Sequence, residues 1–147
     1  MRGPHYERKT NEHQAAPGGA VPLVRISLMK GKPAGFVEKL GGIVYETMVE
    51  TINVPQGDRF QVVTEHDASG LLYDPSYLGI QRSDGIVIIQ MTITEGRTVE
   101  KKQALYKRLA ERLKGELGVR IEDVFVNLVE VKKENWSFGN GIAQYVT

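Results

Sequence analysis

The feature of this sequence that most constrains its fold is an internal repeat. Residues 22–66 and 86–131 follow the same order of apolar, glycine and aspartate positions, with a displacement of 65 residues between the aligned members of each pair, such as Val24 and Ile89. Further aligned pairs are Gly31 with Gly96, Leu40 with Leu105, Asp58 with Asp123 and Phe60 with Phe125. Self-similarity at a fixed spacing indicates that one structural unit occurs twice.

Each unit is predicted to fold as a strand, a helix and a second strand. In the first unit, residues 23–29 alternate between apolar and polar, as in a strand with one buried face. Apolar residues then recur every four positions from Phe36 to Ile52, which predicts an amphipathic helix with Pro33 in its first turn. Residues 55–57 should end this helix, and residues 60–64 should form the second strand.

The second unit repeats this order. Residues 86–94 form a nearly continuous apolar run, typical of a central strand. A helix should follow Thr98 as N-cap and end at Gly118, and residues 124–131 should form the last strand. The long connection 67–85 is rich in Gly, Ser, Asp and Tyr, and residues 136–146 suggest a short closing hairpin.

Two such units predict one α/β (α+β) domain over residues 22–147. Right-handed crossovers would give a four-stranded mixed sheet with both helices on one face. The strand over 86–93 is apolar on both sides, and the chain has no spare element to cover the second face of the sheet. We therefore expect oligomerisation, with sheets packed around a symmetry axis.

Residues 1–21 differ from the rest of the chain because they hold almost nothing to bury. We expect them to be a disordered extension. Val21 precedes Pro22, and the valine codon GUG can serve as a bacterial start codon that is read as methionine, which is removed before proline. Under this hypothesis residues 1–21 come from a start site assigned too early or from an addition made for expression, and Pro22 carries a free secondary amine. The alternative is a genuine tail, which leaves the Pro22 nitrogen a tertiary amide without a proton.

Composition narrows the classes of function. The net charge is +1 with no basic cluster, which argues against nucleic acid or an anionic membrane as partner. The chain has no cysteine, and its three histidines lack the spacing of metal ligands, so no metal or cofactor is expected. No apolar run approaches the length of a membrane span, and residues 1–21 lack the apolar region of a secretory signal, so we expect a cytoplasmic protein.

Taken together, these features resemble the tautomerase superfamily, and within it the malonate semialdehyde decarboxylase branch of fused, single-chain members. The resemblance begins with the strand that opens at Pro22 and covers residues 22–146. The matching segments are Val54-Pro55, Asp58-Arg59-Phe60-Gln61, Leu78-Gly79, Arg82-Ser83, Arg97, Asp123-Val124 and Trp136-Ser137-Phe138-Gly139.

The resemblance implies a β-α-β-β-α-β protomer that assembles as a homotrimer and acts on a small carboxylate substrate without a cofactor. By position it makes Pro22 the proton-transferring amine and Asp58 the carboxylate that activates water or orients the proline. Arg97 would bind the substrate carboxylate. The apolar wall of the pocket would consist of Trp136, Phe138 and Tyr145.

One position departs from the decarboxylase pattern. Those enzymes carry a second arginine two residues before the one matched by Arg97, and this chain has Glu95 there. A pair of arginines binds a carboxylate and orients it for loss of carbon dioxide, so Glu95 disfavours decarboxylation. The implied activity is therefore tautomerisation of small 2-oxo or 2-hydroxydienoate acids, with hydratase or decarboxylase activity as a side reaction.

Several alternatives stay open at this point. An apolar pocket and a nearby Arg97 would lower the pKa of the Pro22 amine and make it a base, whereas Asp58 would raise that pKa and make it an acid. Asp58 could also merely cap a turn, as its repeat partner Asp123 is expected to do. His66 is either a polar residue at a strand end or part of the site.

Two further alternatives concern Arg97 and the whole domain. Arg97 has a basic repeat partner, Lys32, so either could be an exposed cation at the start of a helix. The second class of function is a non-catalytic trimeric ligand-binding or assembly domain, in which residues 1–21 block Pro22.

Overall fold

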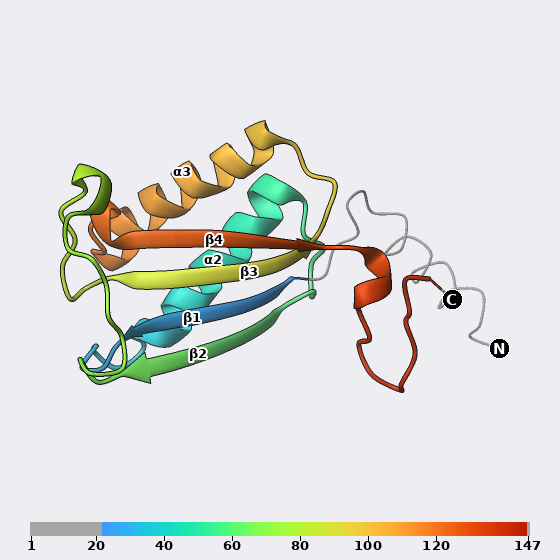
Figure 1. Cartoon of the computed structure of the whole chain (residues 1–147), viewed down its shortest axis with the longest axis horizontal. Coiled ribbons are helices and arrows are strands. Elements are labelled where there is room, and N and C mark those ends of the chain that lie inside the picture. The colour runs from blue at the N-terminus through green and yellow to red at the C-terminus, as the bar shows by residue number, and fades with distance from the viewer. Residues whose placement is uncertain (1–21, 147) are drawn as a thin grey trace.

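The computed structural model describes residues 22–146 of the 147-residue chain, so the predicted extension 1–21 lies outside the described residues. Figure 1 shows two β-α-β units in succession. They are β1 (Leu23–Met29), α2 (Phe36–Ile52) and β2 (Phe60–His66), then β3 (Val87–Thr94), α3 (Val99–Leu117) and β4 (Val124–Val131). Three single-turn helices lie outside this frame: η1 (Tyr77–Gly79), η2 (Ile121–Asp123) and η3 (Lys133–Asn135). The predicted repeat of strand, helix and strand is confirmed.

The four strands form one mixed sheet in the order β2-β1-β3-β4. Strands β1 and β2 are parallel, as are β3 and β4, and the central pair β1 and β3 is antiparallel. Leu23 pairs with Phe60 in the first unit, and Ile88 pairs with Phe125 in the second. Leu23 and Ile88 are equivalent positions of the repeat, as are Phe60 and Phe125, so the two units have the same strand register.

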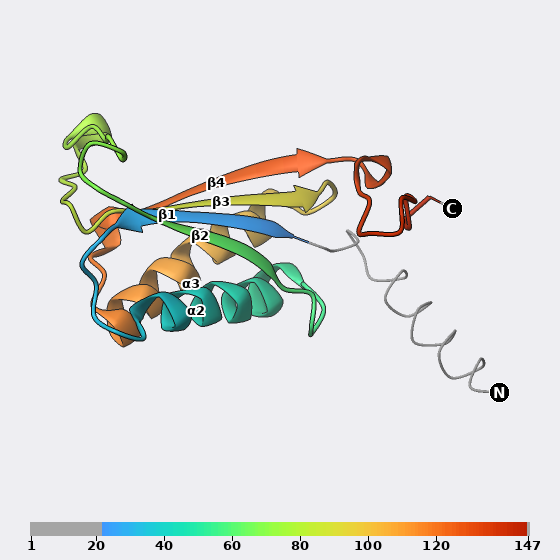
Figure 2. The same cartoon turned by 90° about the horizontal axis from the view of Figure 1, so that it is seen from below.

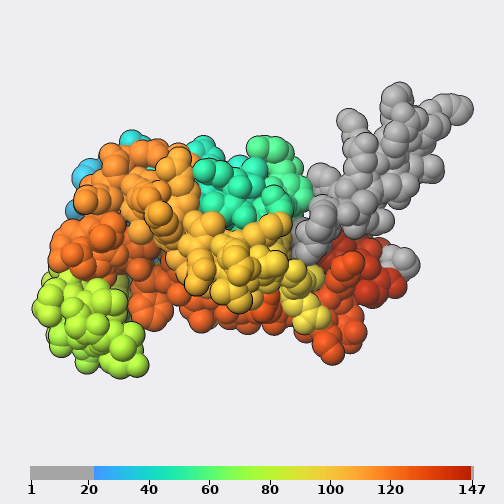
Figure 3. All heavy atoms as spheres, turned by 90° about the horizontal axis from the view of Figure 1, so that it is seen from above, coloured from blue at the N-terminus to red at the C-terminus, as the bar shows by residue number. Residues whose placement is uncertain are grey.

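Both helices pack on one face of the sheet, as predicted (Figure 2). The core lies between these layers, and its members from β1 are Val24, Ile26 and Leu28. Figure 3 shows that the outer surfaces of α2 and α3 cover this side of the molecule, while the connection between the units forms a lobe beyond them. The open face of the sheet carries partly exposed apolar side chains, namely Leu23, Phe60, Val62, Phe125 and Val129.

The ends of the helices differ in how closely they follow the sequence prediction. Thr98 caps α3, because its Oγ1 accepts a hydrogen bond from the backbone N–H of Lys101, and Gly118 ends α3 in the left-handed conformation. For α2 the prediction that Pro33 lies in the first turn is wrong. Gly35, with φ of 85°, turns the chain into the helix only at Phe36, and its left-handed backbone separates Pro33 from the helix.

The closing hairpin predicted for residues 136–146 does not form. This segment contains turns but no strand. Gly139, Asn140 and Gly141 all have positive φ, so three consecutive residues leave the extended conformation that a strand requires. The side chain of Gln144 holds the loop instead, accepting from the Phe138 N–H and donating to the Gly139 carbonyl.

Within residues 22–146, neither α2 nor α3 combines the length and the apolar character needed to cross a membrane.

Candidate functional site

The topology brings all six predicted site residues to one end of the sheet. Pro22 directly precedes β1, and Asp58 precedes β2, which is parallel to β1. Arg97 follows β3, which is antiparallel to β1, and the segment from Trp136 to Tyr145 follows β4. We call this the Pro22 end, and the opposite end, where β3 begins, the Val87 end.

Pro22 lies in an apolar pocket of about 250 Å³. The pocket is lined by Pro22, Leu23, Phe60, Trp136, Ser137 and Phe138. Pro22 itself is buried. A concave, mainly apolar site of this small volume suits a small ligand that is oriented by a few polar groups.

An aromatic cluster contributes Trp136 and Phe138 to one wall of this pocket, with Tyr145 packed behind Phe138. The rings of Trp136 and Phe138 are stacked with their centroids 5.4 Å apart, and Tyr145 meets Phe138 edge-on at 5.0 Å. Such offset-stacked and edge-on pairs are favourable geometries for aromatic rings. The indole Nε1–H of Trp136 donates to Oγ1 of Thr94 at 3.0 Å, which fixes the wall to the end of β3.

Arg97 is held by the backbone and is not an exposed cation. Its Nε donates to the carbonyl of Ile52 at 2.9 Å, and one terminal nitrogen donates to the carbonyl of Thr94 at 3.0 Å. Burial lowers the pKa of the Arg97 guanidinium, and the negative charge of Glu130, followed by that of Asp58, opposes this effect. Arg97 therefore joins the end of α2 to the end of β3, which is a structural role, and it is not among the residues that line the pocket.

Asp58 and Tyr145 share the electrostatic environment of Arg97. Asp58 is only 6% exposed, which is unusual for a carboxylate. The pKa of Tyr145 is raised to about 12, chiefly by burial and also by the charge of Asp58, while the charge of Arg97 acts in the opposite direction. Tyr145 is therefore a neutral phenol at physiological pH, so its hydroxyl can donate a hydrogen bond in the site.

Three polar residues considered from the sequence lie away from Pro22. His66 ends β2 at the Val87 end, and Lys32 and Asp123 lie at that end too. Asp123 accepts hydrogen bonds from the backbone N–H of Ser83 at 2.7 Å and from its hydroxyl at 2.6 Å, as expected for a structural aspartate. Glu95 is at the Pro22 end but is exposed.

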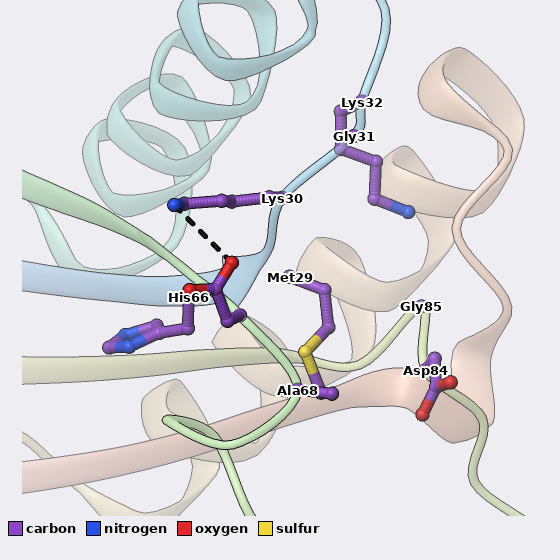
Figure 4. A pocket seen from close by; sticks show the side chains of 9 residues that line it. Met29, Lys30, Gly31, Lys32, His66, Ala68, Asp84 and Gly85 are labelled. Carbon is purple, nitrogen blue, oxygen red and sulfur yellow. Dashed lines mark ion pairs between the residues drawn. The ribbon is translucent and has the colours of Figure 1, made fainter.

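A larger pocket, of about 480 Å³, also lies at the Val87 end. Figure 4 shows Met29, Lys30, Lys32, His66 and Asp84 around it, with the ion pair between Lys30 and Asp67 at 3.3 Å. Its walls contain neither an aromatic ring next to a proline nor a counterpart of the Arg97 contacts. The candidate site is therefore the smaller pocket, because that pocket joins Pro22 to the aromatic wall.

Sequence reasoning missed several residues of the pocket. The strand register places Leu23 and Phe60 side by side, so a predicted pairing of β1 with β2 could have identified them. Thr94 lies outside the pocket lining but holds Trp136, and it had no such signal, because its hydroxyl contact joins residues 42 positions apart. Among residues 22–146, no group of three or more His, Asp or Glu side chains is arranged to hold a metal ion.

Comparison with known proteins identifies a family and relatives that this chain resembles. A family described as "Tautomerase enzyme" matches residues 58–139. The probable tautomerase YusQ of Bacillus subtilis (strain 168) is 44% identical over 126 residues, which cover 86% of this chain and 99% of that protein.

Solved structures of known proteins are similar to this chain as well. Malonate semialdehyde decarboxylase, described with its decarboxylase and hydratase activities, is 31% identical with a TM-score of 0.78 over 84% of this chain and 95% of its own. FG41 malonate semialdehyde decarboxylase inhibited by 3-bromopropiolate is 38% identical with a TM-score of 0.78, over 84% and 94%. A symmetric trimer of fused 4-OT shares the fold at 22% identity, with a TM-score of 0.69 over 84% and 97%.

Proposed function

This chain belongs to the tautomerase superfamily, and from that premise we propose that it is a cofactor-independent tautomerase of small 2-oxo or 2-hydroxydienoate acids, with Pro22 as the residue that transfers the proton. The observation that carries this proposal is the apolar pocket in which Pro22 is buried beside Trp136 and Phe138. An amine in such a pocket is shielded from bulk water, which favours its neutral, basic form.

The proposed reaction needs only one proton-carrying group. The neutral secondary amine of Pro22 takes a proton from the substrate hydroxyl or from the carbon next to its carbonyl, and becomes an ammonium. The electron pair left on the substrate moves through the enol system, and the ammonium returns the proton at a different atom. No proton is gained or lost overall, so the amine is regenerated in each turnover.

The other residues have supporting roles in this proposal. Arg97 binds the substrate carboxylate, and its two backbone contacts would keep the guanidinium in a fixed orientation. The aromatic wall of Trp136, Phe138 and Tyr145 excludes water. Asp58 orients the Pro22 amine, and in a hydratase side reaction it would activate a water molecule.

We favour tautomerisation over decarboxylation because of Glu95. Its carboxylate occupies the position at which the decarboxylases would need a second cation, and it is exposed to solvent two residues before Arg97. A single arginine can hold a carboxylate, but it does not form the paired clamp that orients one for loss of carbon dioxide.

We also propose that three protomers assemble with their sheets around a common axis. The partly exposed apolar side chains on the open face of the sheet support this arrangement, because packing against another layer would bury them. The symmetric trimer of fused 4-OT, which has the same fold, provides a precedent.

The proposal requires that Pro22 carries a free amine. The match to YusQ spans 126 residues and takes in 99% of that relative, a length that fits a working chain beginning at Pro22. If residues 1–21 remain attached, the same pocket could bind a carboxylate but could not transfer a proton through Pro22.

The test compares three proteins in the ketonisation of phenylpyruvate enol: the full chain, a chain that begins at Pro22, and that shorter chain with Pro22→Ala. We expect activity only with a free Pro22, and a loss of about 10²–10⁴-fold in the Pro22→Ala variant. Pro33→Ala, at an exposed proline outside the pocket, is the matched control and should retain full activity. Absence of turnover before the mutation, or full turnover after it, would reject proline catalysis in favour of a binding domain.

A further inference from the structure

Thr94, the last residue of β3, contacts two of the residues proposed to bind substrate. Its Oγ1 accepts a hydrogen bond from Nε1–H of Trp136, and its backbone carbonyl accepts one from Arg97, each at 3.0 Å. We propose that Thr94 is a positioning residue that fixes the aromatic wall relative to the carboxylate anchor. The role of Thr94 in positioning substrate-binding residues rests on the proposed function, whereas its two hydrogen bonds are present in the structure whatever the function is.

The burial of Thr94 shows that the contact with Trp136 is a specific feature of this strand. Side chains of a strand alternate between its two faces. The helix-facing residues of β3 are Val87, Ile89, Met91 and Ile93. Thr94 therefore shares the open face with Ile88, Gln90 and Thr92, which are half-buried or exposed, yet Thr94 is only 1% exposed. An open-face threonine becomes this buried only when another segment covers it, and Trp136 is bonded to its hydroxyl.

Ring stacking and one hydrogen bond orient the indole of Trp136. It lies in a segment without strands, after the single turn of η3, and its backbone N–H donates to the carbonyl of Lys133. The indole is held by stacking on Phe138 and by the hydrogen bond to Thr94. An indole N–H that loses its partner seeks another acceptor or water, so the ring would turn away from the position it has in the pocket wall.

Arg97 is fixed by Thr94 in a different way. The guanidinium is planar, and its donors point in set directions. Two of these donors are engaged by carbonyls at the ends of two elements, Ile52 of α2 and Thr94 of β3. The orientation of Arg97 is therefore defined by the backbone, and a change in the side chain of Thr94 leaves it intact.

This separation makes the hydroxyl of Thr94 testable by itself. Thr94→Val keeps the branched shape and the backbone carbonyl but removes the acceptor for Trp136. Thr94→Ser keeps the hydroxyl and removes only a methyl group. Thr92→Val, on the same face of the same strand and outside the pocket lining, is the matched control.

The readout is the fluorescence of Trp136, which is the single tryptophan of the chain. In the full-length protein, we expect Thr94→Val to shift the emission to longer wavelength as the indole meets water. Binding of 2-oxobutanoate is measured by its quenching of the same emission, and butanone serves as the uncharged control ligand. In Thr94→Val the affinity for 2-oxobutanoate should weaken about three- to tenfold. Thr94→Ser and Thr92→Val should leave the emission in place and the binding within about twofold of the original.

Two results would overturn the proposal. One is unchanged emission in Thr94→Val, and the other is an equal effect of Thr94→Ser, which would indicate a packing role for the methyl group. Should the original protein fail to bind 2-oxobutanoate, the proposed function would be in error, but the emission of the variants would still decide the role of Thr94.

A second pair of variants covers the case in which Thr94→Val does not fold. Trp136→Phe keeps the stacking on Phe138 and removes the N–H, so calorimetry with 2-oxobutanoate should show the same three- to tenfold weakening. Adding Thr94→Ser to Trp136→Phe should then cause no further loss of binding. Undiminished binding by Trp136→Phe would contradict the positioning role.

Discussion

Arg25 and Gln90 occupy equivalent positions in the two repeats, and they pair directly with each other across the antiparallel strands β1 and β3. A pair of equivalent residues that face each other marks the position of an internal two-fold axis. The neighbouring pairs agree, because Leu23 with Thr92 is the counterpart of Ser27 with Ile88. This axis relates the Pro22 end of the sheet to the Val87 end.

The two-fold relation makes the ends of the sheet natural controls for each other. Pro22, Asp58 and Arg97 correspond to Val87, Asp123 and Lys32. At the Val87 end the chain continues through Ser83 into β3, and Ser83 donates two hydrogen bonds to Asp123. Differences between equivalent positions therefore report what distinguishes a candidate site from a structural turn.

The first prediction compares the two aspartates. Asp123→Asn should lower the free energy of unfolding by about 1–3 kcal/mol, because an amide group offers only one acceptor oxygen to the two groups of Ser83. Asp58→Asn in a chain beginning at Pro22 should instead lower kcat/KM by at least about tenfold. Urea unfolding and phenylpyruvate ketonisation, measured on both variants, check this assignment. The reverse pattern would make Asp58 the structural residue.

The second prediction concerns the double role of Arg97. Arg97→Lys keeps the positive charge but cannot reach the carbonyls of both Ile52 and Thr94 with the same geometry, so unfolding should become easier by about 1–3 kcal/mol. The KM for a 2-oxo acid should rise in the same variant. Lys32→Ala, at the equivalent position, should change stability by less than about 0.5 kcal/mol. Loss of stability without a change in KM would restrict Arg97 to its structural role.

The third prediction is a pH dependence of stability due to Tyr145. Its pKa rises from 10.0 to about 12 in the folded protein, chiefly through burial. Between these values the unfolded chain releases a proton that the folded chain keeps, so stability should be unaffected below pH 10 and should fall as pH rises toward about 12. Urea unfolding on both sides of pH 10 should show a smaller decline in Tyr145→Phe than in the original protein. Equal declines would exclude Tyr145 as the source.

The fourth prediction tests the proposed trimer. Phe125 is 45% exposed on the open face of the sheet, at the end away from Pro22. Phe125→Glu would place three carboxylates in the proposed interface and should weaken association at least about tenfold. Val99→Glu, an apolar position 62% exposed on the first turn of α3, should leave the assembly unchanged. Sedimentation velocity measures both, and an unaltered mass in Phe125→Glu would place any interface elsewhere.

The elements of this fold were predictable because their patterns are local. The predicted bounds of β1 and β4 match those observed, and the apolar spacing from Phe36 to Ile52 coincides with α2. The repeat also predicted the order of the elements across the whole domain, because one copy of the unit predicts the strand, helix and strand of the other. The error in residues 136–146 arose because consecutive residues with positive φ leave no signature other than glycine and asparagine, which occur in hairpins too.

The contacts that define the candidate site were beyond sequence reasoning. Arg97 binds a carbonyl 45 residues away, and a backbone carbonyl carries no information about which side chain it accepts from. Thr94 illustrates the same limit, since a threonine at the end of a strand is common and nothing marks it as the partner of Trp136. The resemblance to a family supplied candidate residues, but their spacing and partners follow from the tertiary structure.

The fusion of both units in one chain has a consequence for how this protein can evolve. In an assembly of two identical short chains, every substitution would be inherited by both ends of the sheet at once. Here a mutation at the codon for Val87 leaves the codon for Pro22 untouched. Selection can therefore act on chemistry at one end of the sheet and on the strength of the turn at the other, without compromise between them.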